Sequence, residues 1–373
     1  MLGFLYVSFM KKLLPFLFAL IFIGSCGENA HKKTLDSSYQ MIEGLAQGTS
    51  YHITYSDEMK RDFQLSVDSI IKVIDLSMST YVDNSRVSLC NNSESKCIVD
   101  IHMLKVFWKS YEVFYLTDGE FDPTVKPLID FWGFGAGKIT SHGAIDSSLV
   151  DSLLKYVGLE HLKLYNTKSG EIIEYMSARD FDQSISYGLL KDGPTQLDFN
   201  AIAQGYTVDV ICELLESKGV LNYLVEVGGE VRVKGKNGKG NYWKVGVDKP
   251  IEDNRGRRSL QAVLTLENKS IATSGNYRKF NIKDGIKYSH TISAKTGYPV
   301  TQQILSATVI ADDCMTADAF ATAFMVMGHK KAINYLQEHK TEIQGYLIYS
   351  DDKGNFLSYT STELEDKINE KID

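Results

Sequence analysis

The chain has 373 residues, of which 43% are hydrophobic and 23% are charged, so it can bury a large core in one domain or in two subdomains. Its formal net charge of −7 argues against nucleic acid as a partner. The four cysteines besides Cys26 lack the paired short spacings of a zinc site.

The first 25 residues have the pattern of a secretory signal. Two lysines after Met10 precede a short apolar run, which is too short for a comfortable membrane span. We therefore expect 1–25 to be a signal peptide with Met10 as the true start. The segment Ile23–Cys26 resembles the lipobox of bacterial lipoproteins, whose cysteine is lipidated; the alternatives are an ordinary signal peptide with a chance cysteine or an uncleaved anchor. On the lipoprotein interpretation, 26–38 is a polar tether that holds the protein at the periplasmic face of a membrane.

Helices and strands are predicted in an irregular order over the main domain, 39–360. Apolar residues at helical spacing predict helices at Phe63–Met78, Met103–Leu116, Asp146–Tyr156 and Ala201–Lys218. Strand patterns occur at Tyr51–Tyr55, Tyr223–Val227, Glu230–Lys234, Trp243–Val247, Gln261–Leu266 and Ser306–Ile310. This order favours an α+β fold of mixed, mainly antiparallel sheets packed with helices over a doubly wound sheet. The charged tail, 361–373, is expected to be a frayed helix.

Cys90 and Cys97 flank a polar loop. They could form a disulfide in an oxidising periplasm, or they could be two free thiols.

Several polar residues lie where loops meet helices or strands. Asp122 precedes Pro123, which favours an extended backbone that presents the carboxylate, although a simple turn would explain the pattern as well. Asp198 or Asn200 is suited to cap the helix that follows, and such a helix start also suits a phosphate. His290 precedes a glycine turn and is the candidate base near neutral pH, although a lone histidine is more often structural.

Asp318 and Thr322 are four residues apart in the Ala-rich stretch Met315–Gly328, which is predicted to be a helix that ends at its glycine. Their side chains would share one face of that helix. A carboxylate and a hydroxyl on an otherwise apolar face could form half of a Mg²⁺ site. The structural alternative is a carboxylate in the first helical turns and a threonine bonded back to the preceding turn.

The order of the motifs resembles the FAD:protein FMN transferase family, also called ApbE-type flavin transferases, from about Gly44 to Gly328. The resemblance rests on nine segments: Gly44–Thr49, Met78–Tyr81, Gly119–Val125, Trp132–Gly135, Asp198–Asp209, Val227–Glu230, Ala272–Gly275, Ser289–Gly297 and Ala317–Thr322. Each is weak alone, but nine in order are highly specific.

The resemblance implies an ApbE-like fold and Mg²⁺-dependent transfer of FMN from FAD to a Thr or Ser of an acceptor protein, which would be an exported or membrane redox subunit. It implies that Asp318, Thr322 and the carbonyl of Ala201 bind the metal, and that His290 assists deprotonation of the acceptor hydroxyl. The residues implied for the FAD site are Gln47, Tyr81, Glu120, Phe121, Asp122, Asp198, Gln204, His290 and Thr291.

The sequence also departs from the family pattern. Gln204 stands where a lysine is common, which removes a positive charge that could help to bind phosphate, and Asn200 stands where glycine is common. Ser293 and Ala294 replace a frequent Asp-Pro, and Gln47 replaces a common Met. Two other functions are compatible with the same residues: an FAD pyrophosphatase that releases FMN and AMP, or a non-enzymatic periplasmic flavin-binding lipoprotein.

Overall fold

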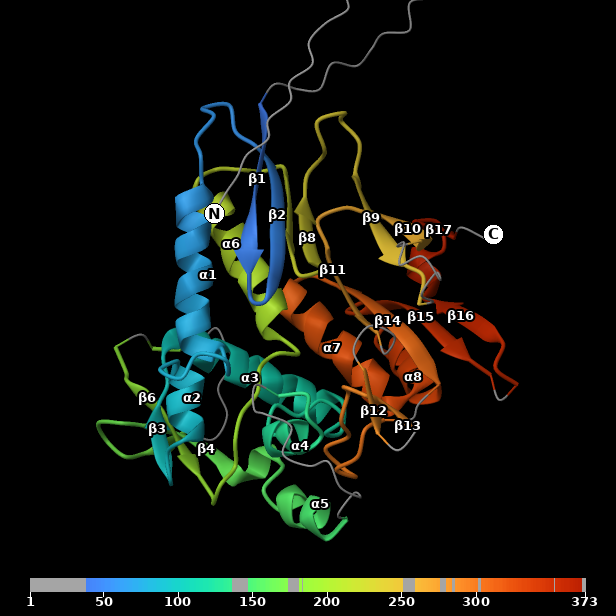
Figure 1. Ribbon diagram of the computed structural model, residues 1–373. Coiled ribbons are helices and arrows are strands. Elements are labelled where there is room, and N and C mark those ends of the chain that lie inside the picture. Colours follow the sequence, from blue (N-terminus) through green and yellow to red (C-terminus); the bar gives the residue numbers. More distant parts are fainter. Residues whose placement is uncertain are drawn as a thin grey trace, which may run out of the picture. The chain divides into compact units, whose positions relative to one another are not determined.

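A computed structural model describes residues 38–135, 147–173, 181–182, 184–250, 259–275, 280–283, 286–300, 303–351 and 353–370 (Figure 1). The chain divides into two units, Met1–Thr34 and Leu35–Asp373, and every described residue belongs to the second. The predicted signal peptide, Cys26 and the tether up to residue 37 therefore lie outside the described residues. Within those residues, no helix has both the length and the apolar character needed to span a membrane.

An eight-stranded sheet is the centre of the second unit, and every neighbouring pair of its strands is antiparallel. In spatial order its strands are β1 (Tyr39–Ala46), β2 (Thr49–Ser56), β7 (Tyr223–Val227), β8 (Glu230–Lys234), β11 (Ser270–Gly275), β14 (Ile304–Ala311), β15 (Gln344–Ser350) and β16 (Phe356–Thr360). Gly228 and Gly229 both have positive φ and form the two-residue turn between β7 and β8.

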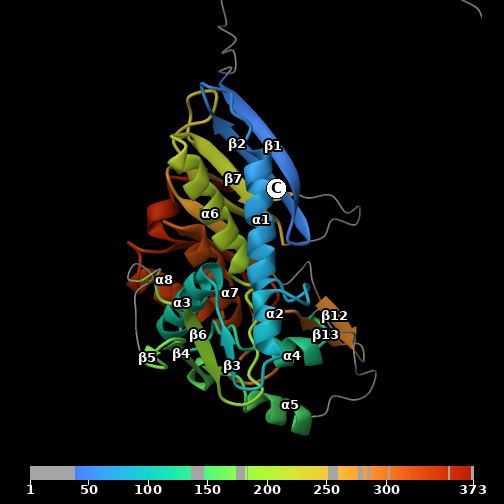
Figure 2. The same cartoon turned by 90° about the vertical axis from the view of Figure 1, so that its left-hand side faces the viewer.

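Four helices pack on this sheet or on one another: α1 (Gln64–Met78), α6 (Ala203–Ser217), α7 (Cys314–Met327) and α8 (His329–Glu338). Helix α6 contacts β7 and β8, while α7 contacts β11, β14 and α6. Helix α1 runs beside α6 in both views (Figures 1 and 2). The small side chains of Ala272 and Ala307 belong to the same apolar cluster as the alanines and phenylalanines of α7, which lets the helix lie close to the strands.

A three-stranded sheet packs against the face of the central sheet opposite to α7. It consists of β17 (Ile368–Glu370), β10 (Leu260–Leu266) and β9 (Trp243–Asp248). Val247 and Leu264 of this sheet share an apolar cluster with Val231, Ile310 and Tyr346 of the central sheet. Ile310 alternates with Val309, which belongs to the α7 cluster, so the two faces of the central sheet have separate cores.

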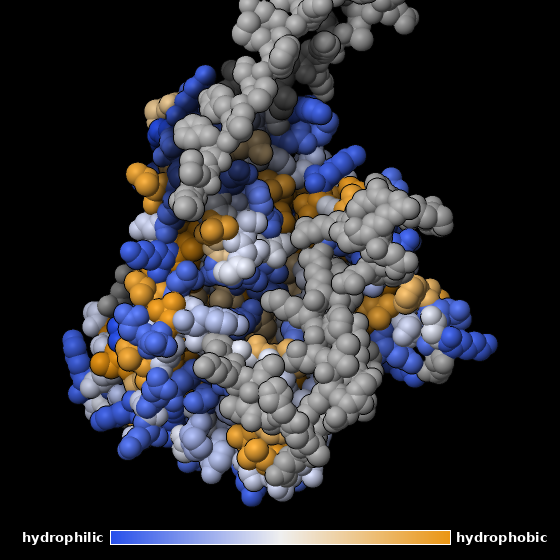
Figure 3. All heavy atoms as spheres, viewed as in Figure 1, coloured by the Kyte–Doolittle hydropathy of each residue, from blue (hydrophilic) through white to orange (hydrophobic). Residues whose placement is uncertain are grey.

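The remaining elements precede α6 or connect later strands. The helices are α2 (Arg86–Asn91), α3 (Ile101–Leu116), α4 (Lys126–Phe131) and α5 (Ser147–Leu154), with the short helices η1 (Leu159–His161) and η2 (Thr362–Leu364). A four-stranded sheet is formed by β3 (Lys96–Ile98), β6 (Tyr187–Lys191), β4 (Leu162–Asn166) and β5 (Ile172–Ile173). β12 (Phe280–Lys283) pairs with β13 (Ile286–Ser289). The face seen in Figure 3 is largely hydrophilic, with separate apolar spots.

Cys90 at the end of α2 and Cys97 on β3 are joined by a disulfide, which resolves the two alternatives for this loop. The ammonium of Lys191 lies beside this bridge and donates to the carbonyls of Cys90, Asn91 and Ser93 at 2.9–3.2 Å. Burial lowers the pKa of Lys191, and the three carbonyls compensate for part of its lost hydration.

The predicted α+β class is confirmed, and the five predicted helices and six predicted strands all occur with small shifts of their ends. Two predictions are wrong: the side-chain cap of α6 and the frayed helix of the tail. Helix α6 begins after Ile202 with no side-chain cap, because Asp198 bonds Asn200 within the preceding turn instead. The described part of the tail, 361–370, is not a frayed helix, because Ile368–Glu370 form a strand that pairs with β10 and Leu364 is buried.

Candidate functional site

Asp318 and Thr322 lie on consecutive turns of α7, as their spacing predicts. Asp318 is only 6% exposed, and its Oδ2 accepts a hydrogen bond from the backbone N–H of Gly205 at 3.1 Å. Burial raises the pKa of Asp318 to about 7; the Gly205 bond opposes this rise and the charge of Asp209 adds to it. The Thr322 hydroxyl is 3.3 Å from the Ser274 hydroxyl of β11. This hydroxyl pair links α7 to β11 at the position of Thr322.

The position of Asp318 depends on a close crossing of α6 and α7. Gly205 has no side chain at this crossing, and a Cβ there would collide with the backbone carbonyl of Cys314 and lie 2.9 Å from the Cβ of Asp318. The absence of a Cβ therefore allows the N–H of Gly205 to reach the carboxylate.

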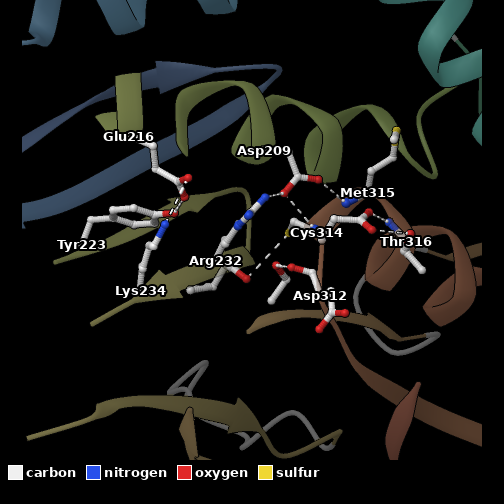
Figure 4. Close-up of polar contacts among 12 residues, drawn as sticks. Asp209, Glu216, Tyr223, Arg232, Lys234, Asp312, Cys314, Met315 and Thr316 are labelled. Atoms are coloured by element: carbon white, nitrogen blue, oxygen red, sulfur yellow. Dashed lines mark hydrogen bonds and ion pairs between the residues drawn. The ribbon is translucent and has the colours of Figure 1, made fainter. Parts of the chain in front are cut away.

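Asp209, one turn further along α6, fixes the start of α7 (Figure 4). Its carboxylate accepts from the backbone N–H groups of Cys314 at 3.0 Å and of Met315 at 2.8 Å. The Arg232 guanidinium of β8 donates to the same carboxylate at 2.7 Å. A carboxylate at a helix N-terminus satisfies free N–H groups and interacts favourably with the helix dipole.

Ala201 lies in the turn that leads into α6, close in sequence to Gly205. The side-chain amide of Asn91 holds this segment, since it donates to the carbonyl of Leu197 at 2.8 Å and accepts from the N–H of Leu197 at 2.7 Å. The N–H of Asp198 donates to the carbonyl of Pro123 at 2.7 Å. This last bond joins the segment of Asp122 to the segment of Asp198.

Three predicted carboxylates of these segments are buried: Glu120, Asp122 and Asp198. Burial raises the pKa of Asp122 to about 6, although the N–H and hydroxyl of Thr124 donate to it at 2.7 and 2.6 Å. Burial also raises the pKa of Asp198, whose carboxylate accepts from Asn200. The Glu120 carboxylate instead pairs with Lys295 at 3.2 Å and Lys331 at 2.9 Å. Phe121, between Glu120 and Asp122 in the sequence, is buried in the main apolar cluster.

Gln204 is the second residue of α6, and Gln47 reaches the same helix from the β1–β2 turn. Gln47, in the β1–β2 turn, donates to the Thr207 hydroxyl of α6 at 2.8 Å. A Cβ on Gly228 would lie 2.5 Å from the amide nitrogen of Gln204, so Gln204 fills the space beside the β7–β8 turn. The structure therefore brings Gln47 to the helix that carries Gln204.

Tyr81 and His290 lie near the edge of this region. Tyr81 is 64% exposed; its partial burial and the charges of Asp198 and Asp130 raise its pKa. The His290 ring contacts Phe134 edge-on with centroids 6.4 Å apart. Thr291 is buried, and its carbonyl accepts from the N–H of Val300 at 2.9 Å. An exposed aromatic ring beside buried carboxylates provides a surface on which a flat ring can stack.

A family model described as the ApbE family matches residues 47–347. The chain belongs to the ApbE family. It is 31% identical over 363 residues to a protein of Vibrio cholerae named FAD:protein FMN transferase, covering 95% of this chain and 98% of the relative. It is 32% identical over 324 residues to a protein of the same name from Escherichia coli K12, with 84% and 86% covered.

Solved structures of the ApbE family have the same fold. The flavin transferase ApbE from Vibrio cholerae superposes with a TM-score of 0.74 at 30% identity, covering 88% of this chain and 99% of that one. The apo flavinyl transferase ApbE from Pseudomonas stutzeri gives 0.72 at 26% identity, with 87% and 96% covered. The named relatives are transferases, and this ApbE-family chain is an enzyme of that class.

Sequence reasoning missed four residues that hold the ApbE-family site together: Asn91, Asp209, Arg232 and Lys331. Asp209 closes one of the motifs, and its carboxylate inside an apolar helix was a signal that it has partners. Arg232 and Lys331 reach the site from distant segments, so neither is marked by its neighbours in sequence.

A Mg²⁺ ion fits the chemistry of the α7 residues. Within the described residues, no three His, Cys, Asp or Glu side chains converge as a metal cluster. Asp318 is a buried carboxylate with one backbone donor to Oδ2, and a hydroxyl lies on the next turn of the same helix. Mg²⁺ takes few protein ligands and completes its shell with phosphate oxygens and water.

Proposed function

We propose that the chain is a Mg²⁺-dependent FAD:protein FMN transferase that attaches FMN through a phosphoester bond to a Thr or Ser of an exported or membrane redox protein. The observation that carries the proposal is the buried Asp318, with Thr322 on the next turn, at the crossing of α6 and α7. The family membership and the names of the relatives support the same reaction.

In this reaction the acceptor oxygen forms a bond to the phosphorus of the FMN half, the bond from that phosphorus to AMP breaks, and AMP leaves. Asp318, Thr322 and the carbonyl of Ala201 would hold Mg²⁺, which when bound neutralises phosphate charge. A ring nitrogen of His290 accepts the proton of the acceptor hydroxyl. The protein contributes mainly by positioning the reactants and by placing charge around the phosphate.

Other residues would bind and orient FAD. Tyr81 offers an exposed ring for stacking, and Asp122 and Asp198 offer buried acceptors in adjacent segments. Gln204 supplies amide donors without the positive charge of a lysine, so phosphate neutralisation depends more on the metal in this chain.

The test incubates the purified protein with FAD, Mg²⁺ and a peptide that carries a Thr flavinylation site. We expect fluorescent peptide and AMP in equal amounts, and neither product after chelation. Asp318→Asn keeps an acceptor for Gly205 but removes the charge, so it should abolish turnover without unfolding the protein. Thr322→Ala should be milder, because water can replace a neutral ligand.

Asp312→Ala is the matched control, since its carboxylate is exposed and precedes the same helix. Full activity of Asp318→Asn, or activity retained in chelator, would contradict the metal assignment. FMN and AMP without labelled peptide would identify an FAD pyrophosphatase. Bound flavin with no AMP would identify a non-enzymatic flavin-binding lipoprotein.

A further inference from the structure

Three loops meet at the end of the central sheet where β2 ends. They are the β2–α1 loop (57–63), the α6–β7 loop (218–222) and the β8–β9 loop (235–242), which lie at the upper end in Figure 1. Hydrogen bonds join the loops: the Arg61 guanidinium donates to the Lys218 carbonyl at 2.9 Å, and the N–H of Lys236 donates to the Asn222 side chain at 2.8 Å. The three loops therefore form one continuous surface, called the loop surface below.

Each of these loops combines an exposed apolar side chain with an exposed lysine. The pairs are Met59 (68% exposed) with Lys60, Leu221 (63% exposed) with Lys218, and Tyr242 (39% exposed) with Lys236. A single exposed apolar residue needs no explanation, but the same pair on three adjoining loops is a pattern. Apolar tips, amphipathic tyrosine and long lysine stems suit the boundary between lipid headgroups and acyl chains.

The charge of the loop surface differs from that of the whole chain. Lys239 is a fourth exposed lysine, in the β8–β9 loop. Glu58 and Asp62 are acidic, while the charges of Asp57 and Arg61 neutralise each other in an ion pair at 2.6 Å. The exposed Glu267, directly after β10, hydrogen-bonds the Tyr242 side chain. The four lysines therefore face three carboxylates, Glu58, Asp62 and Glu267, which leaves a small positive excess although the chain as a whole carries −7. Such a surface is attracted to anionic phospholipid.

The chain also enters the folded unit at the loop surface. The carbonyl of Ser38 accepts from the N–H of Asp57 at 3.0 Å, and the Tyr39 hydroxyl donates to the Lys236 carbonyl at 2.5 Å. Cys26 precedes Ser38 by 12 residues (38 − 26), which reach about 40 Å at most when fully extended. An acyl chain on Cys26 would thus keep the loop surface within reach of the bilayer.

We propose that the loop surface binds the anionic phospholipid surface of the membrane that carries the lipid anchor. Met59, Leu221 and Tyr242 enter the headgroup region, and the lysines contact lipid phosphate. This inference rests on the proposed lipidation of Cys26, which supplies the attachment but leaves the orientation of the domain free. The loop surface fixes that orientation.

The test uses the full-length lipidated protein on vesicles of phosphatidylcholine alone or of an equal mixture with phosphatidylglycerol. Flotation with the vesicles reports the anchor, and amide hydrogen exchange reports the loop surface. We expect flotation with both kinds of vesicle, and slower exchange in all three loops only on the anionic ones. The β4–β5 turn, residues 167–171, lies away from these loops in Figure 2 and should exchange equally on both kinds of vesicle.

Charge reversal tests the lysines. Because one lysine near an anionic bilayer typically strengthens association about fivefold, Lys60→Glu with Lys236→Glu should lower the ratio of docked to undocked protein at least about 30-fold. Lys155→Glu with Lys163→Glu should leave the ratio unchanged: both lysines are exposed, but Lys155 directly follows α5 and Lys163 is on β4, which lie at the opposite end of the unit in Figure 1. Leu221→Ser should weaken docking, whereas Leu149→Ser on α5 should not.

The outcomes separate the loop surface from the anchor and from the enzyme. Flotation with equal exchange on both vesicles overturns the loop surface and leaves the anchor intact. Absence of flotation with either vesicle overturns both. Equal effects of the paired variants and their controls also overturn the loop surface. Transfer of FMN to a soluble peptide is assayed separately, so its failure would contradict only the proposed reaction.

Discussion

Buried carboxylates define the chemistry of the site at the scale of single residues. Asp122, Asp198 and Asp318 are each almost inaccessible, and burial raises the pKa of all three. The contacts described for them are hydrogen bonds from backbone and side-chain donors rather than ion pairs. Carboxylates kept in a desolvated state are costly to the fold, and they occur mainly where a ligand or reaction uses them.

Asp122 makes the stability of the protein depend on pH. Burial raises the pKa of Asp122 in the folded protein to about 6, above its ordinary value of 3.8, so ionisation favours the unfolded state. Its contribution to stability is therefore complete below pH 3.8 and is lost as the pH rises through about 6. Asp122→Asn cannot ionise and does not suffer this loss, so from pH 4 to pH 7 the variant should gain about 2 kcal/mol of unfolding free energy relative to the original protein in urea unfolding.

Asp57 is the control with the opposite sign. Its hydrogen bond from Arg61 lowers its pKa, so its contribution is present above the ordinary pKa and is lost as the pH falls. Asp57→Asn should therefore lose stability relative to the original protein at pH 7 and recover it in acid. Parallel trends in the two variants would contradict the assignment for Asp122.

His290 can be tested as a general base. We expect His290→Ala to lower single-turnover FMN transfer roughly 10²–10⁴-fold, the usual contribution of general-base catalysis. FAD affinity, measured by flavin fluorescence, should change far less, because the role belongs to the transition state. Affinity that falls in step with the rate would make His290 a binding residue, and an unchanged rate would remove it from the mechanism.

At the scale of elements, the crossing of α6 and α7 joins the proposed metal site to the core. Gly205→Ala should gain some helix propensity but force the helices apart. Overpacking of this kind typically costs about 1–3 kcal/mol, so we expect a net loss in urea unfolding. Ser217→Ala at the exposed end of α6 should stay within about 0.5 kcal/mol. A Gly205→Ala variant as stable as the Ser217→Ala control would show that the crossing can relax.

Elements with strong local patterns were predictable from sequence. The β7–β8 hairpin was predicted with the correct ends, because two glycines separate alternating strands and only one tight turn fits them. Helix α7 was predicted because Ala-rich spacing ends at Gly328, whose φ is 81°. By contrast, β3 is three residues long and exists through its pairing with β6, some 90 residues later in the chain. A pairing of that range leaves no signal in the local sequence.

At the scale of the whole molecule, the sequence placed site residues correctly on elements but could not show how they meet. The position of Asp318 and Thr322 on one face of a helix follows from their spacing within a single predicted helix. The approach of Asp318 to Gly205 depends on tertiary packing over a separation of 113 residues. The residues of the FAD site and the role of His290 came from resemblance to a family, and they stay predictions for this chain.

Lipidation of Cys26 can be tested on the whole cell. Cys26→Ser should release the protein into the soluble periplasm or leave it unprocessed, because stable anchoring needs several acyl chains on that residue. Membrane fractionation with immunoblotting measures the change, and Cys212→Ser is a control at a buried thiol. Equal solubility of the original protein and Cys26→Ser would contradict the anchor.

Helix α6 also has a geometric consequence for the choice of acceptor. It begins at Ala203, two residues after Ala201, and ends at Ser217, next to Lys218 of the loop surface. Its 15 residues span about 22 Å. If the loop surface lies on the bilayer, the length of α6 sets the distance between the proposed metal site and the lipid surface. An acceptor hydroxyl held at that distance from the bilayer would be modified. The same acceptor sequence held at the lipid surface, or much further from it, would not reach the site.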